Sequence, residues 1–300
     1  MITMVEDKAL FLGCTIPGRI PFIEKSAKCV CEDLGINTEV LEGFACCPDP
    51  VGIQALDKDT WLALAARNLC VAEAANKGIM TLCTGCAMTL KSANHEMMCS
   101  HHSKEKVNAI LSKVGKEYAG TLPSVRHIAQ VLYDEVGVDA IKEKVQRPLS
   151  GFKVALHHGC HFLRPSEIIK FDDPFHPTKV DELVRATGAE SVDYTEKMLC
   201  CGHGVSSESP DIATSMNLKK FRSIAKAGAQ AIVVLCPSCY LRLEAGQRDV
   251  KKKFGEEFVL PVLHLTDLLA LAFGHSGDEI GLKDHRPNPA KALEAVGISV

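Results

Sequence analysis

Ten of the fourteen cysteines in this 300-residue chain fall into two sets of five. In each set, one cysteine is followed by an adjacent Cys-Cys pair and then by a Cys-x-x-Cys motif, with the spacings Cx31CCx35CxxC and Cx39CCx34CxxC. The first set is Cys14, Cys46, Cys47, Cys83 and Cys86, and the second is Cys160, Cys200, Cys201, Cys236 and Cys239. Thiolates are soft metal ligands, so two matched sets predict two metal or redox sites.

The number and spacing of these thiols favour one kind of metal site over another. A structural zinc ion takes four ligands in a tetrahedron, and adjacent cysteines do not easily occupy two of its corners. Iron–sulfur clusters are bound by thiolates alone, and a fifth sulfur could bridge two irons. Two zinc sites with spare buried thiols remain the alternative. A redox-active disulfide between Cys46 and Cys47 would leave both Cys-x-x-Cys motifs unexplained.

Composition excludes several other classes of function. The chain is 46% hydrophobic and 24% charged, which is enough apolar material for a packed core. Its 34 basic and 37 acidic residues give a net charge of −3, and only 5% of residues are aromatic, which argues against nucleic-acid binding. No apolar run reaches the roughly 18 residues of a membrane helix, and the first residues lack the apolar stretch of a signal peptide. We therefore expect a cytoplasmic protein with reduced thiols and with no nucleic-acid or membrane partner.

Short apolar runs precede several of these cysteines and predict the strands that position them. The loops that follow the carboxyl ends of parallel strands converge on one edge of a sheet, so three distant segments could deliver five sulfurs to one point. The predicted fold is α/β, with two duplicated domains, each a small, mostly parallel sheet flanked by helices, and with the cysteines at the loop edge. The predicted strands are 9–12, 36–41, 79–82, 153–156 and 231–235, and the predicted helices are 20–34, 59–76, 179–187 and 211–227.

Two further segments support an internal duplication. Residues 125–132 and 262–269 align, and each places a histidine, His127 or His264, at the start of a predicted helix, where we expect it to cap or pack that helix. The seam between the halves falls where proline, serine and glycine cluster, near residue 148. We predict an N-terminal cysteine-rich domain at 1–148, a C-terminal cysteine-rich domain at 149–275 and a surface extension at 276–300.

The remaining cysteines and the histidines near the second set are weaker candidates for chemistry. Four cysteines lie outside the repeated pattern and are expected to be small buried hydrophobic residues: Cys29, Cys31, Cys70 and Cys99. Three histidines crowd around Cys160: His157, His158 and His161. His161 directly follows the cysteine and is the candidate hydrogen-bond donor or proton source.

The cysteine pattern resembles the paired cysteine-rich CCG domains found in the B subunit of heterodisulfide reductase. The resemblance is carried by both spacings and by three local strings, ACCPDPVG at 45–52, HGCHFLRP at 158–165 and CCG at 200–202, and it extends over roughly residues 8–274. Two departures are Pro48, which stands where the domain has glycine, and the second spacer of 34 residues, which is one residue short; neither removes a cysteine. The resemblance implies two noncubane [4Fe-4S] clusters, each held by the five cysteines of one set.

The resemblance also implies a reaction and its partners. The chain would be the catalytic subunit that reduces the heterodisulfide of coenzyme M and coenzyme B to two thiols in the energy metabolism of methanogenesis. It would work with the family's ferredoxin-like C subunit and its flavin-containing A subunit, and indirectly with a hydrogenase or a formate dehydrogenase. No C-x2-C-x2-C-x3-C-P run occurs in this sequence, so a second polypeptide would have to bring electrons.

The substrate of that family carries sulfonate, phosphate and carboxylate groups, which basic side chains would have to bind. Candidates close in sequence to the cysteines are Arg19, Lys91 and Arg164, each of which could equally form an ordinary surface ion pair. Two alternatives to this function stay open. One is the iron–sulfur subunit of a hydroxy-acid dehydrogenase or fumarate reductase type of complex, and the other is a two-zinc scaffold protein.

Overall fold

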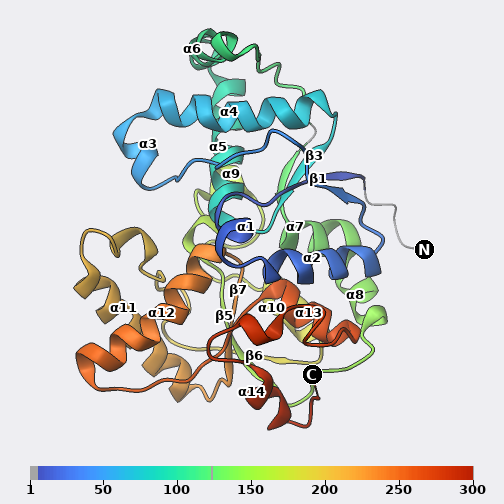
Figure 1. Cartoon of the computed structure of the whole chain (residues 1–300), viewed down its shortest axis with the longest axis vertical. Helices are drawn as coiled ribbons and strands as arrows, with labels where there is room; N and C mark the ends of the chain where they lie inside the picture. The colour runs from blue at the N-terminus through green and yellow to red at the C-terminus, as the bar shows by residue number, and fades with distance from the viewer. Residues whose placement is uncertain (1–5, 123, 300) are drawn as a thin grey trace.

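The computed structural model describes residues 6–122 and 124–299, and within them the strands form two four-stranded sheets (Figure 1). The strand orders are β2-β1-β3-β4 and β6-β5-β7-β8, and all neighbouring strands are parallel. This confirms the predicted α/β fold with a duplicated parallel sheet. The strands are β1 (Lys8–Phe11), β2 (Thr38–Glu39), β3 (Gly78–Thr81), β4 (Val125–His127), β5 (Lys153–His157), β6 (Glu190–Val192), β7 (Ala231–Val234) and β8 (Val262–His264).

Helices connect successive strands and cover the faces of both sheets. Those of the N-terminal half are α1 (Thr15–Arg19), α2 (Phe22–Asp33), α3 (Gly52–Leu56), α4 (Lys58–Ala74), α5 (Thr84–Cys99), α6 (His101–Leu111), α7 (Ile128–Val131) and α8 (Val138–Lys144), with the short turns η1 (Ser112–Val114) and η2 (Leu132–Val136). Those of the C-terminal half are η3 (Cys160–Phe162), α9 (Ser166–Ile169), α10 (Lys179–Ala186), η4 (His203–Val205), α11 (Pro210–Lys226), α12 (Pro237–Phe254), α13 (Leu265–Phe273), η5 (Leu282–Asp284) and α14 (Ala290–Glu294). Among the described residues, no helix combines the length and the apolar character needed to cross a membrane.

Local sequence explains where the α4 segment begins and ends. Asp57 caps α4, because its carboxylate accepts a hydrogen bond from the backbone N–H of Thr60 at 3.0 Å. The sequence predicts a helix that runs to a stop at Gly78, but α4 ends at Ala74, and Asn76 makes the turn with φ 49°. Gly78 instead begins β3, where a Cβ atom would lie 2.8 Å from Ser124 Oγ. Asparagine tolerates the left-handed region, which is why it can replace glycine in this turn.

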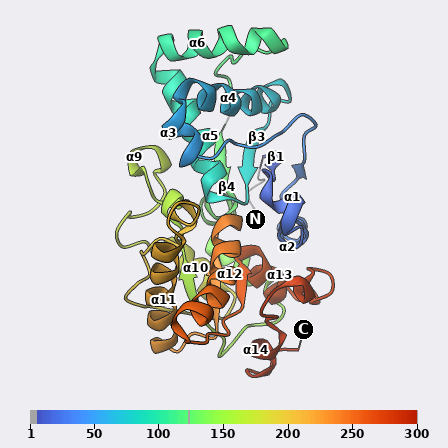
Figure 2. The ribbon, with the colours of Figure 1, turned by 60° about the vertical axis from the view of Figure 1, so that its left-hand side comes forward.

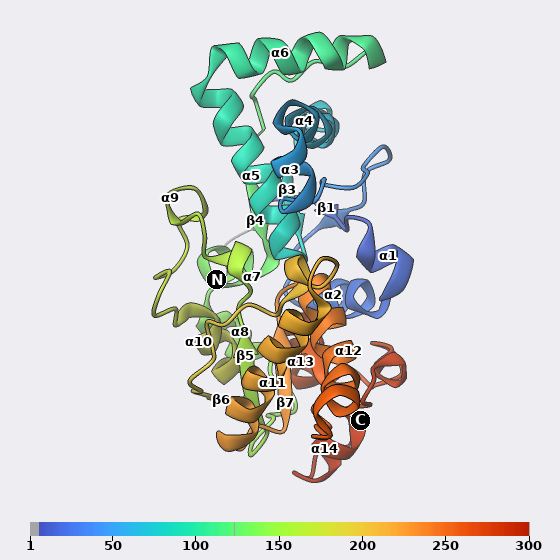
Figure 3. The same cartoon turned by 90° about the vertical axis from the view of Figure 1, so that its left-hand side faces the viewer.

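The two halves pack against each other through α2 and α13 (Figures 1 and 2). At their buried contact, Ser26 Oγ donates to Asp267 Oδ1 at 2.5 Å and lies 2.8 Å from Thr266 Oγ1. On another side of the molecule, α8 contacts α10. The resulting body is elongated, with α6 at the far end of the N-terminal half (Figure 3). If the halves separated, the buried carboxylate of Asp267 would lose its hydrogen bond from Ser26. This hydrogen bond therefore favours one arrangement of the two sheets.

Three local predictions are wrong, and each error concerns burial or pairing. The segment 276–300 was expected to be a surface extension, yet His285 and Leu293 are buried, and His285 Nδ1 lies 3.1 Å from the hydroxyl of Tyr240. Cys99 was expected to be buried, but it is exposed at the end of α5, where the helix leaves the core. The predicted strand 36–41 is shortened to β2, because β2 pairs only with β1.

Candidate metal centre

The sheet topology brings the first cysteine and the Cys-x-x-Cys motif of each set together. In both sheets the strand order reverses between the two central strands, and the loops that follow those strands diverge around a crevice. Cys14 lies three residues after β1, and Cys83 lies two residues after β3, directly before α5. Cys160 and Cys236 hold the same places after β5 and β7. The prediction that strand ends place the cysteines at one edge of each sheet agrees with this arrangement.

A glycine precedes the first cysteine of each set because the backbone turns there. Gly13 has φ 68° and Gly159 has φ 81°, a region that residues with a Cβ atom rarely adopt. A Cβ atom on Gly13 would lie 3.1 Å from the Sγ of Cys86, and one on Gly159 would lie 3.7 Å from the Sγ of Cys239. These two glycines therefore let the turn approach the thiols of the Cys-x-x-Cys motif.

A buried asparagine holds each adjacent cysteine pair in place. Asn68 of α4 donates from Nδ2 to the carbonyl of Cys46 at 3.0 Å and accepts from the N–H of Ala45 at 2.8 Å. Asn217 of α11 donates from Nδ2 to the carbonyl of Cys201 at 2.8 Å. Both asparagines are buried, one on α4 and one on α11. Each helix therefore fixes the position of the loop that carries the adjacent cysteine pair, which the sheet topology alone does not fix.

The ten thiols form one continuous row in which each is in contact with the next. At the centre of the row, Cys83 Sγ lies 3.8 Å from Cys236 Sγ, so the two sets meet across the two halves of the chain. The order of the row is Cys14, Cys46, Cys47, Cys86, Cys83, Cys236, Cys239, Cys201, Cys200 and Cys160. The central thiols are buried, whereas Cys14 and Cys46 are exposed at one end and Cys160 is half-buried at the other.

Contacts within the row favour one thiolate in each adjacent pair. Hydrogen bonds from the thiols of Cys46 and Cys86 lower the pKa of Cys47 to about 5. Hydrogen bonds from the thiols of Cys160 and Cys201 lower the pKa of Cys200 to about 2. A thiolate surrounded by neutral thiols is stabilised because its neighbours donate to it. Since the thiolate is the form that binds metal, the adjacent pair of each half presents one thiolate, Cys47 in the first set and Cys200 in the second.

The donor set fits a cluster held by thiolates better than a single ion. Each half offers five sulfur atoms in continuous contact, one more than a tetrahedral zinc site can use. All ten cysteines are free thiols, and six of them are buried. Within the described residues, the group whose ligand atoms lie within 4.8 Å of one another is His157, Cys201 and Cys239. Soft, sulfur-rich ligation of this kind is typical of iron–sulfur clusters.

His127 and His264 cap their helices, as the sequence predicts, and each also forms a hydrogen bond to the opposite half. His127 accepts from the N–H of Ala129 at its Nδ1, and His264 accepts from the N–H of Thr266, so each caps its helix. Because Nδ1 accepts, Nε2 carries the proton in the neutral ring. His127 Nε2 donates to the carbonyl of Leu235 at 2.9 Å, and His264 Nε2 donates to the carbonyl of Leu82 at 3.1 Å. Each histidine thus holds the backbone directly before the Cys-x-x-Cys motif of the opposite half.

The basic residues proposed for substrate binding occupy different surroundings. Arg164 lines a small cavity with Cys160 and His158, and its Nη2 donates to the carbonyl of Pro174 at 2.9 Å. Arg19 is exposed at the end of α1. Lys91 Nζ donates to the carbonyl of Ile169 at 3.2 Å, and burial, with the nearby charge of Arg126, lowers its pKa to about 8. His161 is half-buried in η3, next to Cys160. The roles of these four residues stay predictions.

Sequence reasoning missed two buried polar residues beside the second set. His157 stands out in the sequence only as one of three clustered histidines, and Lys220 was not singled out, although it interrupts the apolar face of the helix predicted at 211–227. In the structure Lys220 is fully buried and donates to the carbonyls of Glu196 and Lys197. A lysine at a core-facing helical position is the signal that could have identified it.

The fold and the row of thiols define a protein built from two copies of one cysteine-rich domain. The family described as "CCG: Cysteine-rich domain" matches residues 8–91 and 154–244, which contain all ten cysteines of the repeated pattern. A crystal structure of a hypothetical protein from Helicobacter pylori has the same fold, with a TM-score of 0.73 and 15% identity over 95% of this chain and 53% of that one.

Similarity to individual proteins narrows the assignment of this chain within the family. The chain is 43% identical to the B subunit of the ferredoxin:CoB-CoM heterodisulfide reductase of Methanosarcina mazei over 92% of each chain. It is 38% identical to a protein of Archaeoglobus profundus that is named as similar to the heterodisulfide reductase B subunit, over 90% of this chain and 92% of that one. It is 33% identical to the 8-methylmenaquinol:fumarate reductase membrane anchor subunit of Wolinella succinogenes over 93% and 96%. The chain belongs to the family of heterodisulfide reductase B subunits, which confirms the predicted resemblance, and it is an oxidoreductase subunit.

Proposed function

We propose that this chain is the catalytic subunit that reduces the mixed disulfide of coenzyme M and coenzyme B to two thiols, using two noncubane [4Fe-4S] clusters. The observation that carries the proposal is the continuous row of ten thiols, in which the two sets adjoin at Cys83 and Cys236. A disulfide spans only about 2 Å between its sulfurs, so two metal sites that act on one disulfide have to be adjacent. The names of the Methanosarcina relatives support this choice of substrate.

The five cysteines of each half would hold one cluster, as two separate ligand sets within the row. When bound, such clusters supply single electrons and iron atoms that take up soft sulfur ligands. The chain itself supplies thiolates at Cys47 and Cys200, and buries the contact between the sets at Cys83 and Cys236 so that water is excluded there. The N-terminal domain would comprise residues 1–148, the C-terminal domain 149–275, and the remaining segment 276–300.

The chain's basic residues would bind the anionic ends of the substrate. Arg164 adjoins Cys160 in the cavity at one end of the row, where the guanidinium can meet a sulfonate or phosphate. Arg19, five residues after Cys14, would do the same at the exposed end of the first set. Lys91 would contribute a further positive charge, and His161 is the proposed proton source for a thiolate product.

Electrons would reach this chain from other polypeptides in the cytoplasm. We propose a ferredoxin-like C subunit and a flavin-containing A subunit as direct partners, with a hydrogenase or a formate dehydrogenase further upstream. The naming of the Methanosarcina relatives as B subunits supports assembly into a complex.

A second function is favoured by one particular relative. The Wolinella protein that matches nearly the whole chain is named a fumarate reductase subunit, so an iron–sulfur subunit of a fumarate reductase or hydroxy-acid dehydrogenase type of complex is the alternative. The two-zinc scaffold is the third possibility. It makes no use of the fifth thiol in each half.

The test is metal analysis and disulfide turnover on anaerobically purified protein. We expect about eight irons and a similar amount of acid-labile sulfide per chain, and an EPR signal that changes when the heterodisulfide is added. With an artificial one-electron donor, the chain should form both thiols. Stoichiometric zinc without iron would leave only the scaffold. Full iron content without disulfide turnover, but with electron transfer from a quinol to fumarate in the presence of a partner, would favour the second function.

A further inference from the structure

The two cysteine sets lie in equivalent positions, so residues around them can be compared pair by pair. Phe11 lies three residues before Cys14, in β1, and pairs with Thr81 of β3. His157 lies three residues before Cys160, in β5, and pairs with Val234 of β7. Phe11 and His157 are therefore equivalent residues, each at the last position of its strand. An apolar ring stands beside the first set where an imidazole stands beside the second.

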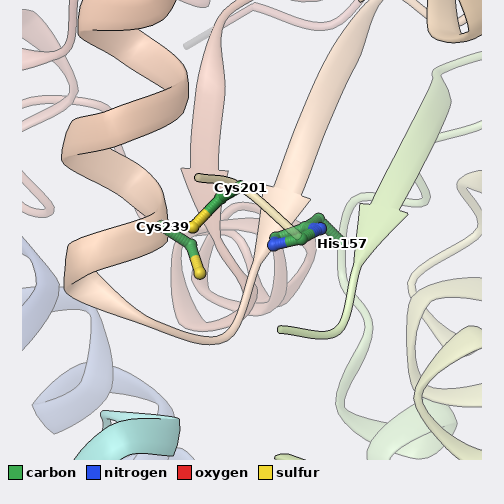
Figure 4. A group of neighbouring side chains, drawn as sticks. All are labelled: His157, Cys201 and Cys239. Atoms are coloured by element: carbon green, nitrogen blue, oxygen red, sulfur yellow. The ribbon is translucent and has the colours of Figure 1, made fainter. Parts of the chain in front are cut away.

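The imidazole of His157 points at the second set (Figure 4). Its ligand atom lies within 4.8 Å of the sulfurs of Cys201 and Cys239. The residue is buried, and within the described part of the chain neither ring nitrogen has a hydrogen-bond partner. An imidazole ring carries at least one N–H in either protonation state, so the ring of His157 offers a donor beside the sulfurs of Cys201 and Cys239. A buried N–H without a partner costs free energy unless an acceptor is present.

A second difference lies on the helix that supports each adjacent cysteine pair. Three residues after Asn68, α4 carries Val71, whereas three residues after Asn217, α11 carries Lys220. The ammonium of Lys220 is fully buried and donates to the carbonyl of Glu196 at 2.5 Å. Burial lowers its pKa to about 8, while the sulfurs of the second set, first among them Cys201 and Cys239, act in the opposite direction. This lysine is thus close enough to interact with the second set.

Other charges add to this asymmetry between the two sets. Hydrogen bonds from Cys46 and Cys86 lower the pKa of Cys47 in the first set, and the nearby carboxylate of Asp49 acts in the opposite direction. In the second set, contact with the Cys200 thiol and burial raise the pKa of Cys160, and the nearby guanidinium of Arg164 acts in the opposite direction. The first set therefore has an apolar ring at the position of His157, a valine at the helix position of Lys220 and a carboxylate near Cys47, whereas the second set has an imidazole and two positive charges nearby.

We infer that Lys220 and His157 give the second cluster a higher reduction potential than the first, so that the first electron to enter the chain is held in the C-terminal half. The inference rests on the proposed function, because it requires a cluster in each set. Reduction adds negative charge to a cluster, and a buried cation and hydrogen bonds to its sulfurs stabilise that charge. Phe11 and Val71 provide neither, and Asp49 opposes the added charge.

The experiment is an anaerobic redox titration followed by EPR on the full chain. The signal that disappears in Cys200→Ser belongs to the second cluster, and the one that disappears in Cys47→Ser belongs to the first. In the wild-type protein the second cluster should be reduced at the higher potential. His157→Phe gives the second set the ring found in the first, and Lys220→Met removes the charge. Each should make reduction of the second cluster at least tenfold less favourable, about 59 mV for one electron, without moving the first.

Matched variants separate tuning from structural damage. His157→Gln keeps an N–H donor and should retain most of the wild-type potential, whereas Val71→Leu, at the apolar position of the first set, should leave both potentials unchanged. His157→Phe tests the inference if Lys220→Met does not fold, and the order of the wild-type potentials needs only the two cysteine variants that assign the signals. A higher potential in the first cluster, or an unchanged potential in His157→Phe with full iron content, would overturn the inference alone. Protein that binds no iron would overturn the proposed function as well.

Discussion

At the scale of single residues, the site depends on which thiols are in contact and which are not. Cys47 and Cys200 carry lowered pKa values because thiols on both sides donate to them. Cys31 and Cys70 lie outside the row and have no contact with its thiols: burial and neighbouring carboxylates raise the pKa of Cys31 to about 12 and that of Cys70 to about 11, and no cysteine of the row contributes to either shift.

This difference predicts which cysteines affect metal content. Cys47→Ser or Cys200→Ser should reduce the iron content by about half, because each removes the thiolate of one adjacent cysteine pair and leaves the other set intact. Cys29→Ser and Cys99→Ser are the controls and should keep full iron content. The measurement is iron per chain after anaerobic purification. Loss of iron in a control variant would show that the ligands are assigned wrongly.

A second prediction at this scale concerns Arg164. Arg164→Ala should raise the KM for the heterodisulfide by about 10- to 150-fold, because a charge-assisted hydrogen bond to an anion contributes roughly 1.5–3 kcal/mol. Arg164→Lys should recover only part of the loss, since a point charge lacks the fork of the guanidinium. The measurement is the steady-state KM at low salt for Arg164→Ala, Arg164→Lys and Arg19→Ala, with the iron content of each variant determined in parallel. Unchanged kinetics in both alanine variants would place the anion site elsewhere.

At the scale of elements, each Cys-x-x-Cys motif is supported by a helix start from the other half. His127 and His264 cap α7 and α13 and also bind the carbonyls of Leu235 and Leu82. The local role requires only a side chain that accepts from the backbone. The hydrogen bond to the opposite half requires a side chain long enough for its N–H to reach that carbonyl. A shorter capping residue does not reach it.

Two substitutions separate these roles. His264→Ala should lower the free energy of unfolding by more than His264→Asn, because asparagine keeps a cap worth about 0.5–2 kcal/mol. Both should leave the Leu82 carbonyl without its buried partner, at a cost of about 1–3 kcal/mol. Urea unfolding measures the loss of the cap and the loss of the bond to Leu82, and iron analysis in parallel shows whether the variants still bind metal. If His264→Asn is as stable as the wild type, the bond between the halves contributes nothing.

The same histidines predict how stability depends on pH. Burial, together with the neighbouring His264, lowers the pKa of His127 to about 3, and burial also lowers that of His264. An unfolded histidine titrates near pH 6.5, so between pH 6.5 and pH 3 the unfolded chain binds more protons than the folded one. The stability that the neutral ring contributes is fully present above about pH 6.5 and is lost as the pH falls toward 3. His127→Asn should therefore show a smaller loss of stability between about pH 7.5 and about pH 5.5, and parallel curves would refute this.

At the scale of the whole molecule, the two halves are joined so that their thiol sets meet. The buried α2–α13 contact and the reciprocal histidine bonds place Cys83 against Cys236. The segment that follows α13 strengthens this contact, because His285 packs against Phe22 of α2 at a ring-centroid distance of 4.2 Å. The two halves therefore enclose a single row of sulfurs.

A prediction at this scale concerns electron supply. Purified alone, the chain should reduce the heterodisulfide with an artificial one-electron donor but not with a physiological one, because it lacks the cysteine run of a ferredoxin-like segment. Adding a ferredoxin-like partner should restore the physiological reaction. Turnover with a physiological donor and no second polypeptide would contradict the expected dependence on partners.

Much of this protein follows from local sequence. The apolar runs that form β1, β3, β5 and β7 are recognisable because a buried parallel strand is a continuous apolar segment, and the cysteines that follow such strands have to lie at the same sheet edge. The helix caps at His127 and His264 are also predictable, because a cap is a contact between residues close in the chain.

Only the tertiary structure decided how the two halves meet. The duplication defines two similar domains, but their docking depends on side chains far apart in sequence, such as Ser26 and Asp267. For this reason the contact of Cys83 with Cys236, the burial of Lys220 and the packing of His285 were not predictable. Spacing determines which residues can share a sheet edge, whereas contacts between separate elements depend on packing that no local pattern encodes.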